Sequence, residues 1–386
     1  MLITLFWATE SNRPVLTRSV RAVALWELIL QVFSGLAKEL YFRSDKENSL
    51  SVHHLTFSKR PWPQSDLIVS KPVAMPLFSV PRPGPEISDR IIDFDPETLE
   101  RRPVRKTDVI EEFIRLGNPW AAKIVADVPG TVDGTMDDEA VDQLLIKVHC
   151  EMQRMSEEFQ HGQRVAELLA PLIQVLRDAA VPTPIRIVDV GCGTGFVIRW
   201  LAANASFGSD VELIGADYNS ALIAEARRLT LAEDLSSRFV VANAFRLEEA
   251  GTLIISTGVL HHFRNAELLQ LFRLHDHHQT HGFVHFDFHP SRVAPFGSWL
   301  FHAARMREPL AKHDGVLSAM RAHSSGELLA AARAGAPNFV SAIYGTQLWG
   351  LPIPRAFHAL VGMRAEHRDG FLARMVNRIH ALGVIE

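Results

Sequence analysis

The sequence predicts an α/β fold, with a mostly parallel seven-stranded sheet, a reversed final strand and an N-terminal helical cap. Short apolar segments alternate with helical patterns between residues 185 and 288, and this alternation is typical of a parallel sheet. Two later strand-like segments are separated by a stretch too short for a helix, so they should pair antiparallel. The strands are expected at 185–190, 211–216, 238–242, 252–257, 282–288, 339–344 and 355–362.

Residues 1–85 are predicted to be a poorly defined N-terminal extension that ends in a proline-rich linker. One helical pattern, about Val20 to Tyr41, stands in this part. Prolines crowd residues 61–85, and proline fixes φ and removes a backbone donor. Met75 lies within the linker. We therefore expect residues 1–74 to be dispensable for folding and binding, and a native start at Met75 is one explanation for them.

Residues 86–180 are predicted to form the helical cap. Thr107 should cap a helix that ends at Gly117. A longer helix has apolar residues on one face between Val141 and Phe159. A third helical pattern follows, in which Pro171 should kink or divide the helix. Residues 181–363 then form the sheet domain, and 364–386 a C-terminal helix.

Composition narrows the class of protein. The chain has 386 residues, a net charge of −4 and no long basic block, which argues against nucleic acid as its main partner. The two cysteines, Cys150 and Cys192, fit neither a disulfide framework nor a zinc pattern. The longest apolar stretch, Ala22 to Ala37, is too short to span a bilayer. We expect a cytoplasmic protein without stable membrane insertion, and its oligomeric state stays open.

The strand at 185–190 runs directly into a glycine-rich turn and a helical pattern. The glycines are Gly191, Gly193 and Gly195, spaced G-x-G-x-G, and Asp189 precedes them. Glycine allows positive φ and close approach of a ligand to the backbone. The following helix offers free N–H groups at its N-terminus. The turn is therefore a candidate site for an anionic or polar ligand group.

A second acid, Asp217, ends the next apolar strand. A carboxylate in this place can accept hydrogen bonds from both hydroxyls of a ribose. The dinucleotide fingerprint is G-x-G-x-x-G, whereas here the third glycine comes one residue early. The spacing therefore counts against a nicotinamide dinucleotide.

The glycine motif and the second acid together resemble class I S-adenosylmethionine-dependent methyltransferases, and the resemblance covers roughly residues 105–363. It implies a Rossmann-like fold and S-adenosyl-L-methionine as cofactor. Asp189 and the glycine turn would hold the methionine part, and Asp217 the ribose. Asn243 stands where the family often has an acid that accepts from the adenine amino group. The predicted cofactor residues are Asp189, Gly191, Cys192, Gly193, Gly195, Asp217, Tyr218, Asn243, Ala244 and Ser256.

The segment from Ser256 to Phe263 contains His261 and His262. It resembles the same region of small-molecule methyltransferases of the ubiquinone/menaquinone-biosynthesis type, although Thr252 stands where those enzymes often have an acid. Imidazole titrates near neutrality and could deprotonate a hydroxyl nucleophile. His261 and His262 are therefore candidate catalytic residues, and a purely structural role remains the alternative.

More histidines follow, at 275, 277, 278, 281, 285 and 289. The first four are interpreted as solvated loop residues, and no metal site is predicted. On the fifth strand, Asp287 and His289 approach the carboxyl end, where open α/β sheets bind ligands. These two residues are therefore candidates for substrate binding, with hydrogen bonding within the loop as the alternative.

The sequence thus favours methyl transfer to a small molecule. The helices at 107–179 and the segment after His289 are expected to form an apolar lid, which favours an aromatic or lipophilic acceptor. The apolar residues of that segment are Phe296, Trp299, Leu300, Phe301 and Met306. Two other classes stay open: a nicotinamide-dependent oxidoreductase, and a catalytically idle cofactor-binding protein with the same fold.

Overall fold

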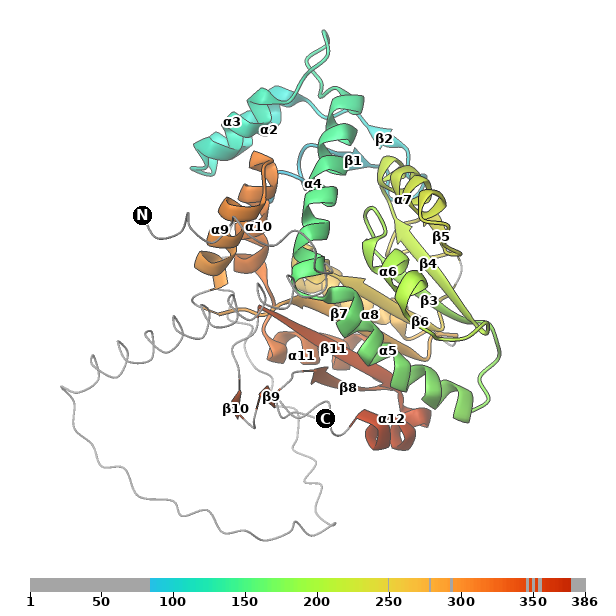
Figure 1. The fold of residues 1–386 in the computed structure, drawn as a ribbon. Coiled ribbons are helices and arrows are strands. Elements are labelled where there is room, and N and C mark those ends of the chain that lie inside the picture. Colours follow the sequence, from blue (N-terminus) through green and yellow to red (C-terminus); the bar gives the residue numbers. More distant parts are fainter. Residues whose placement is uncertain are drawn as a thin grey trace, which may run out of the picture.

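A seven-stranded sheet forms the centre of the protein (Figure 1). The computed structural model describes residues 84–248, 250–277, 279–291, 294–344, 347–348, 351–352 and 356–375. The predicted helix at 20–41, the proline-rich linker with Met75 and the last part of the C-terminal helix lie outside the described residues. The strand order is β5 (Arg238–Val241), β4 (Val211–Asp217), β3 (Ile185–Val190), β6 (Leu253–Thr257), β7 (Gly282–Phe288), β11 (Phe357–Arg364) and β8 (Phe339–Tyr344).

The last strand of the sheet in the sequence, β11, runs opposite to its neighbours. It pairs antiparallel with both β7 and β8, whereas β3 pairs parallel with β4 and β6. The predicted mostly parallel, Rossmann-like sheet with a reversed final strand is therefore confirmed. The short connection from β8 to β11 explains the reversal, because a parallel pair needs a longer crossover. Two-residue strands, β9 (Gln347–Leu348) and β10 (Leu351–Pro352), lie within that connection.

Both faces of the sheet are buried under helices. Ile185 and Ile187 of β3 belong to one core, and Val188 and Val190 belong to a second core on the opposite face. This alternation follows from the period of two along a strand. The first core includes residues of α5 (His161–Asp178), α6 (Phe196–Asn204), α7 (Ser220–Ala232) and α12 (Arg368–Met375), and the second includes residues of α8 (Asn265–His275) and α11 (Ser325–Gly335).

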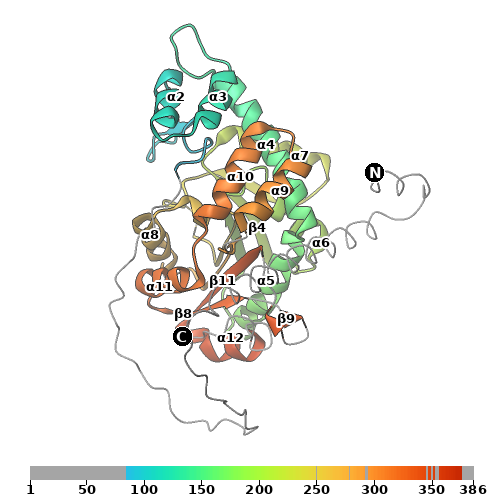
Figure 2. The ribbon, with the colours of Figure 1, turned by 90° about the vertical axis from the view of Figure 1, so that its left-hand side faces the viewer.

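Helices also stand beyond the carboxyl ends of the parallel strands. The cap contains α2 (Lys106–Arg115), α3 (Pro119–Asp127) and α4 (Asp138–Glu158), after the short pair β1 (Asp93–Phe94) and β2 (Arg101–Arg102). An insertion after β7 adds α9 (Ala294–Arg305) and α10 (Pro309–Arg321). In both views these two orange helices lie beside α4 (Figures 1 and 2), and α10 contacts α3 and α4.

Three local details differ from, or add to, the prediction. The N-cap of α2 is Arg105 rather than Thr107, because the helix begins at Lys106. Helix α5 is a single helix that contains Pro171, so this proline does not divide it. In α9, Phe301 is buried, whereas Phe296 and Trp299 are 49% and 53% exposed and their rings stack with centroids 5.8 Å apart. None of the described helices is long and apolar enough to cross a membrane.

Candidate active site

The glycine turn after β3 borders a large cleft. The described residues enclose about 2110 Å³ there. Gly191, Gly193 and Gly195 have φ values of +69°, +54° and +75°, a region that side chains other than glycine rarely adopt. A Cβ on Gly193 would lie 2.4 Å from Nδ1 of His149, and one on Gly195 would lie 2.3 Å from Phe239. Glycine is therefore required both by the turn and by close packing.

Asp217 holds this turn in place from the end of β4. Its carboxylate accepts hydrogen bonds from the N–H groups of Gly193 and Asn219, both at 2.9 Å. Burial raises the pKa of Asp217, against the effect of these hydrogen bonds. The side chain of Asn219 caps the N-terminus of α7, because it accepts hydrogen bonds from the N–H groups of Ala221 and Leu222. Asp217 is therefore not needed as the cap of this helix. Each carboxylate oxygen keeps a lone pair for a hydroxyl in the cleft.

Asp189 is a buried acid with an unsatisfied oxygen. It lines the cleft, and its Oδ1 atom has no hydrogen-bond partner among the described residues. Burial, together with the nearby Asp217 carboxylate, raises its pKa well above the usual value. A buried carboxylate without a partner is costly. The site is therefore suited to a ligand that brings a positive charge or hydrogen-bond donors.

Other predicted cofactor residues lie around the same cleft. Cys192, Tyr218 and Ala244 line it, and the Tyr218 ring packs edge-on against Phe94, with centroids 5.2 Å apart. Asn243 also lines it, but its amide oxygen already accepts from the N–H of Phe245 at 2.9 Å. One lone pair of that oxygen remains for a ligand.

Ser256 does not line the cleft, in contrast to the prediction. It is buried, and its hydroxyl pairs with Nδ1 of His285 at 2.8 Å. The other nitrogen of His285 pairs with Nε2 of His275, also at 2.8 Å. His275 is consequently a buried residue at the end of α8 rather than a solvated loop histidine. The next residue, Thr257, lines the cleft instead.

His261 faces the cleft and is oriented from behind by Asp287. Its Nδ1 atom pairs with Oδ1 of Asp287 at 2.8 Å, and its backbone N–H donates to the other carboxylate oxygen at 2.9 Å. Although burial opposes ionisation, the charge and hydrogen bond of His261 lower the pKa of Asp287 to about 2. Asp287 itself does not line the cleft. Asp287 was predicted to contact the substrate, but in the structure its carboxylate contacts His261 instead.

His289 also stands outside the cleft-lining residues, contrary to the prediction. Its backbone N–H donates to the carbonyl of Ala356, and its ring lies edge-on against His358, with centroids 5.1 Å apart. The chain has already left β7 at this point. Phe288, the last residue of β7, lines the cleft, and so do Pro290 and Ser291, which follow His289 in the chain.

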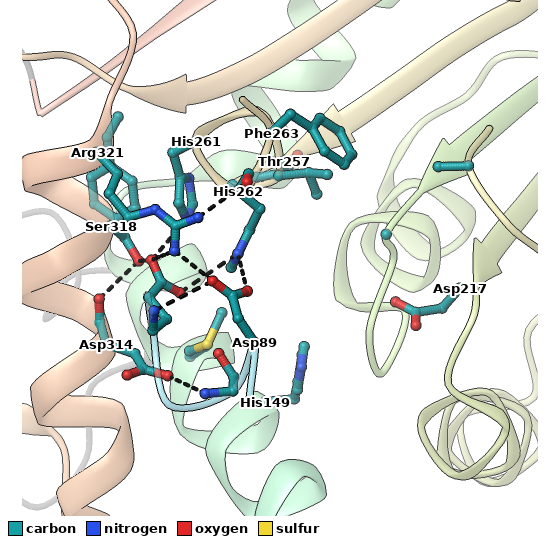
Figure 3. Close-up of a pocket in the computed structure, with 18 of the residues that line it drawn as sticks. Asp89, His149, Asp217, Thr257, His261, His262, Phe263, Asp314, Ser318 and Arg321 are labelled. Atoms are coloured by element: carbon teal, nitrogen blue, oxygen red, sulfur yellow. Dashed lines mark hydrogen bonds and ion pairs between the residues drawn. The ribbon is translucent and has the colours of Figure 1, made fainter. Parts of the chain in front are cut away.

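His262 belongs to a charged cluster that also lines the cleft (Figure 3). Its Nδ1 atom lies 3.0 Å from Asp89 and 3.6 Å from Glu86. Arg321 of α10 contacts Asp89 at 2.6 Å and Glu86 at 3.4 Å. Burial disfavours the charged imidazole, but Glu86 and Asp89 outweigh this and raise the pKa of His262 to about 9. His262 is therefore positively charged at neutral pH.

The segment that carries Glu86 and Asp89 is fixed to α10. Asp314 accepts from the N–H groups of Ile87 and Ser88, both at 2.9 Å. The hydroxyl of Ser318 donates to Glu86 at 3.0 Å. Burial raises the pKa of Glu86. The sequence offered no local signal for Glu86, Asp89 or Arg321, because each comes from a segment without a recognisable motif.

Comparisons with a family model and with solved structures found similarities. Residues 187–279 match a family model described as a methyltransferase domain. The comparison with curated protein sequences gave no match. Among solved structures, the chain is similar to the plantazolicin methyltransferase BpumL in complex with SAH (13% identity, 58% of this chain and 95% of that chain, TM-score 0.41). It is also similar to magnesium protoporphyrin IX methyltransferase ChlM from Synechocystis PCC 6803 with bound SAH (15% identity, 67% and 99%, TM-score 0.35).

The matched segment begins in β3 and ends just after α8. It contains the glycine turn and Asp217, together with the turn that carries both cleft histidines. It does not contain Glu86, Asp89 or Arg321. We call the wall of the cleft formed by residues 185–217 the glycine side, and the wall that carries His261, His262, Glu86, Asp89 and Arg321 the histidine side. The glycine side thus lies almost wholly within the segment that is similar to a methyltransferase domain.

Proposed function

We propose that this protein is an S-adenosylmethionine-dependent methyltransferase that methylates a hydroxyl group of a small aromatic or lipophilic acceptor. The observation that carries the proposal is the buried, unpartnered carboxylate of Asp189 beside the glycine turn. This group needs a cationic or donating ligand. The match of residues 187–279 to a methyltransferase domain supports the same cofactor.

The residues of the glycine side fit this cofactor. Asp189 would pair with the positively charged methionine part, beside Gly191 and Cys192. The free lone pairs of Asp217 would accept from the ribose hydroxyls, and Asn243 would lie at the adenine. When bound, S-adenosylmethionine supplies a methyl group activated by a sulfonium.

On the opposite side, His261 is the proposed general base. Its Nδ1–H donates to Asp287, so the tautomer leaves the lone pair of Nε2 for the acceptor hydroxyl. That Nε2 atom lies 3.8 Å from Glu86, at the wall of the cleft. His262 cannot serve as the base at neutral pH because its raised pKa, about 9, keeps it protonated.

Apolar side chains that line the cleft support this acceptor class. Phe288 packs edge-on against its ring, with centroids 5.4 Å apart, and lines the cleft together with Phe357 and Leu310. Burial of apolar surface stabilises an aromatic or lipophilic molecule there. A quinone-type precursor, as the resemblance of the Ser256–Phe263 segment implies, is one member of this class. Residues 86–180 and 294–321 would cover it and exclude water.

The test is an incubation of the full chain with S-adenosylmethionine and a panel of phenols and lipophilic alcohols. Mass spectrometry should detect the acceptor with one added methyl group, together with S-adenosylhomocysteine. A matched panel of the corresponding methyl ethers, which lack the free hydroxyl, should give no product. Cofactor binding without turnover on any acceptor class would favour an idle binding protein. Hydride transfer with a nicotinamide cofactor would contradict the proposal.

A further inference from the structure

Three side chains with metal-ligating atoms meet at the end of the sheet opposite to the cleft. His281 stands directly before β7, and Glu366 and His367 belong to a 3-10 turn after β11, η3 (Ala365–His367). Because β7 and β11 are antiparallel, the start of one meets the end of the other, with Gly282 opposite Met363. Strand β7 has seven residues, so this place is roughly 20 Å from the carboxyl end of the strand.

The ligating atoms are close enough to hold one ion. Nδ1 of His281 lies 2.9 Å from Nε2 of His367. Oε1 of Glu366 lies 3.5 Å from the first nitrogen and 3.4 Å from the second. Atoms bound to zinc at about 2.0–2.1 Å in a tetrahedron are about 3.3 Å apart. The observed triangle therefore needs only small side-chain movements to bind zinc.

The surroundings suit an open metal site. The side chains of His281 and His367 are 17% and 8% exposed, whereas Glu366 is 58% exposed and leaves a path for an ion and a water ligand. Burial, with the neighbouring His367, lowers the pKa of His281, and burial lowers the pKa of His367. A lowered pKa favours the neutral ring, which is the form of histidine that binds a metal.

The backbone around these ligands is already fixed. The N–H of His281 donates to Thr252 at 2.8 Å, and its carbonyl accepts from Arg364 at 2.9 Å. The guanidinium of Arg364 donates to the carbonyls of Thr280 and His277. A site whose ligands are held in the free protein loses little entropy when the ion binds.

We propose that His281, Glu366 and His367 bind one zinc ion, with water completing a four-coordinate site, and that the ion ties the start of β7 to the segment after β11. The sequence predicted no metal, because Glu366 and His367 stand far from His281 along the chain. A second group, Glu86 with His261 and His262, also brings possible ligands together. There the guanidinium of Arg321 contacts Glu86 and Asp89, so a positively charged side chain already stands where a metal ion would.

The experiment is calorimetric titration of the full chain with Zn²⁺ in a non-chelating buffer. We expect one site, whose affinity falls at least about tenfold in His281→Gln and in His367→Gln, since even the loss of a group behind a ligand costs that much. The matched control is His277→Gln, a histidine of the same loop region, which should bind as the wild type does. The chain has 18 histidines, so zinc could also bind elsewhere. The variant His261→Gln tests whether the ion binds at the second group of possible ligands, in the cleft.

Loss of binding in His261→Gln with retention in His281→Gln would overturn the proposal, as would equal binding by all variants. Thermal unfolding gives a second measurement, because an ion bound only by the folded state raises the melting temperature. Zn²⁺ should raise it in the wild type and in His277→Gln but not in His281→Gln. If His281→Gln fails to fold, Glu366→Gln, at an exposed position, replaces it. An unchanged zinc affinity in that variant would remove Glu366 from the site.

Discussion

The two sides of the cleft are built in different ways. The glycine side comes from one continuous stretch, in which β3, the turn, α6 and β4 follow one another. The histidine side is assembled from distant segments: Asp89 is 173 residues from His262 and 232 residues from Arg321 in the sequence. A local motif therefore describes the first side, whereas only the folded chain brings the second side together.

The two sides also differ in how their charges are balanced. Asp189 and Asp217 are buried with raised pKa values, and among the described residues no positively charged side chain lowers either pKa. On the other side, Glu86 and Asp89 face His262 and Arg321. Among the described residues, the acids of the glycine side thus face no positively charged side chain, whereas the acids of the histidine side do. We infer that the first binds the cofactor and the second positions and deprotonates the acceptor.

The largest effect is expected on the histidine side. His261→Gln should lower turnover by about 10²–10⁴-fold, the usual contribution of a general base. Asp287→Asn should lower it to a similar extent, because His261 loses its oriented tautomer. The double variant should be no slower than either single one, since the pair acts as a unit. Steady-state rates and cofactor dissociation constants measure this.

If the cofactor binds only on the glycine side, its affinity should stay unchanged in the His261 and Asp287 variants. A parallel fall in cofactor affinity and turnover would mean that His261 belongs to the cofactor site. Wild-type turnover in both single variants would remove the base altogether.

On the glycine side, Asp217→Ala should weaken cofactor binding by about 1–3 kcal/mol, the cost of leaving hydrogen-bonding groups without a partner. The melting temperature should also fall, because Gly193 and Asn219 lose their acceptor. Turnover at saturating cofactor should change little. The control is Asp127→Ala, an exposed acid of α3. Unchanged affinity in a folded Asp217 variant would contradict the assignment.

Asp189→Asn should separate stability from binding. Between the ordinary value of 3.8 and the raised folded pKa of Asp189, the folded protein binds more protons than the unfolded chain. The free energy of unfolding therefore falls as the pH rises through this range. An amide removes that loss, so the melting temperature without cofactor should rise at neutral pH by about 1 °C for each kcal/mol regained in a chain of this length. Cofactor affinity should fall. A lower melting temperature with unchanged affinity would show that Asp189 is only structural.

The smallest effect concerns His262. Its folded pKa of about 9 lies above the ordinary 6.5, so its stabilising contribution is complete below pH 6.5 and is lost as the pH rises through about 9. The melting temperature should fall over that window, and His262→Gln should flatten the fall. The side chain is 34% exposed, so solvent screens the ion pairs and the effect is modest. An equal pH dependence in both proteins would contradict this account.

The sequence predicted the sheet and the glycine side because their signals are local. The length of a strand, the spacing of the glycines and the acid at the end of a strand can each be recognised within a few consecutive residues. Ser256 was assigned wrongly because the face of β6 on which a residue lies depends on pairing with β3 and β7. Asp287 was assigned to the substrate, whereas its carboxylate contacts His261, and the alternation of side chains along β7 does not reveal this partner. Glu86 and Arg321 could not be predicted, because their meeting depends on how residues 84–92 pack on α10.

The central claim is that the glycine side binds S-adenosylmethionine rather than a nicotinamide dinucleotide. Titration calorimetry with S-adenosylhomocysteine, repeated in the presence of excess NAD, tests it directly. We predict one binding site per chain for S-adenosylhomocysteine and no change in its apparent dissociation constant when NAD is present. Equal or tighter binding of NAD, or its displacement of S-adenosylhomocysteine, would contradict the claim.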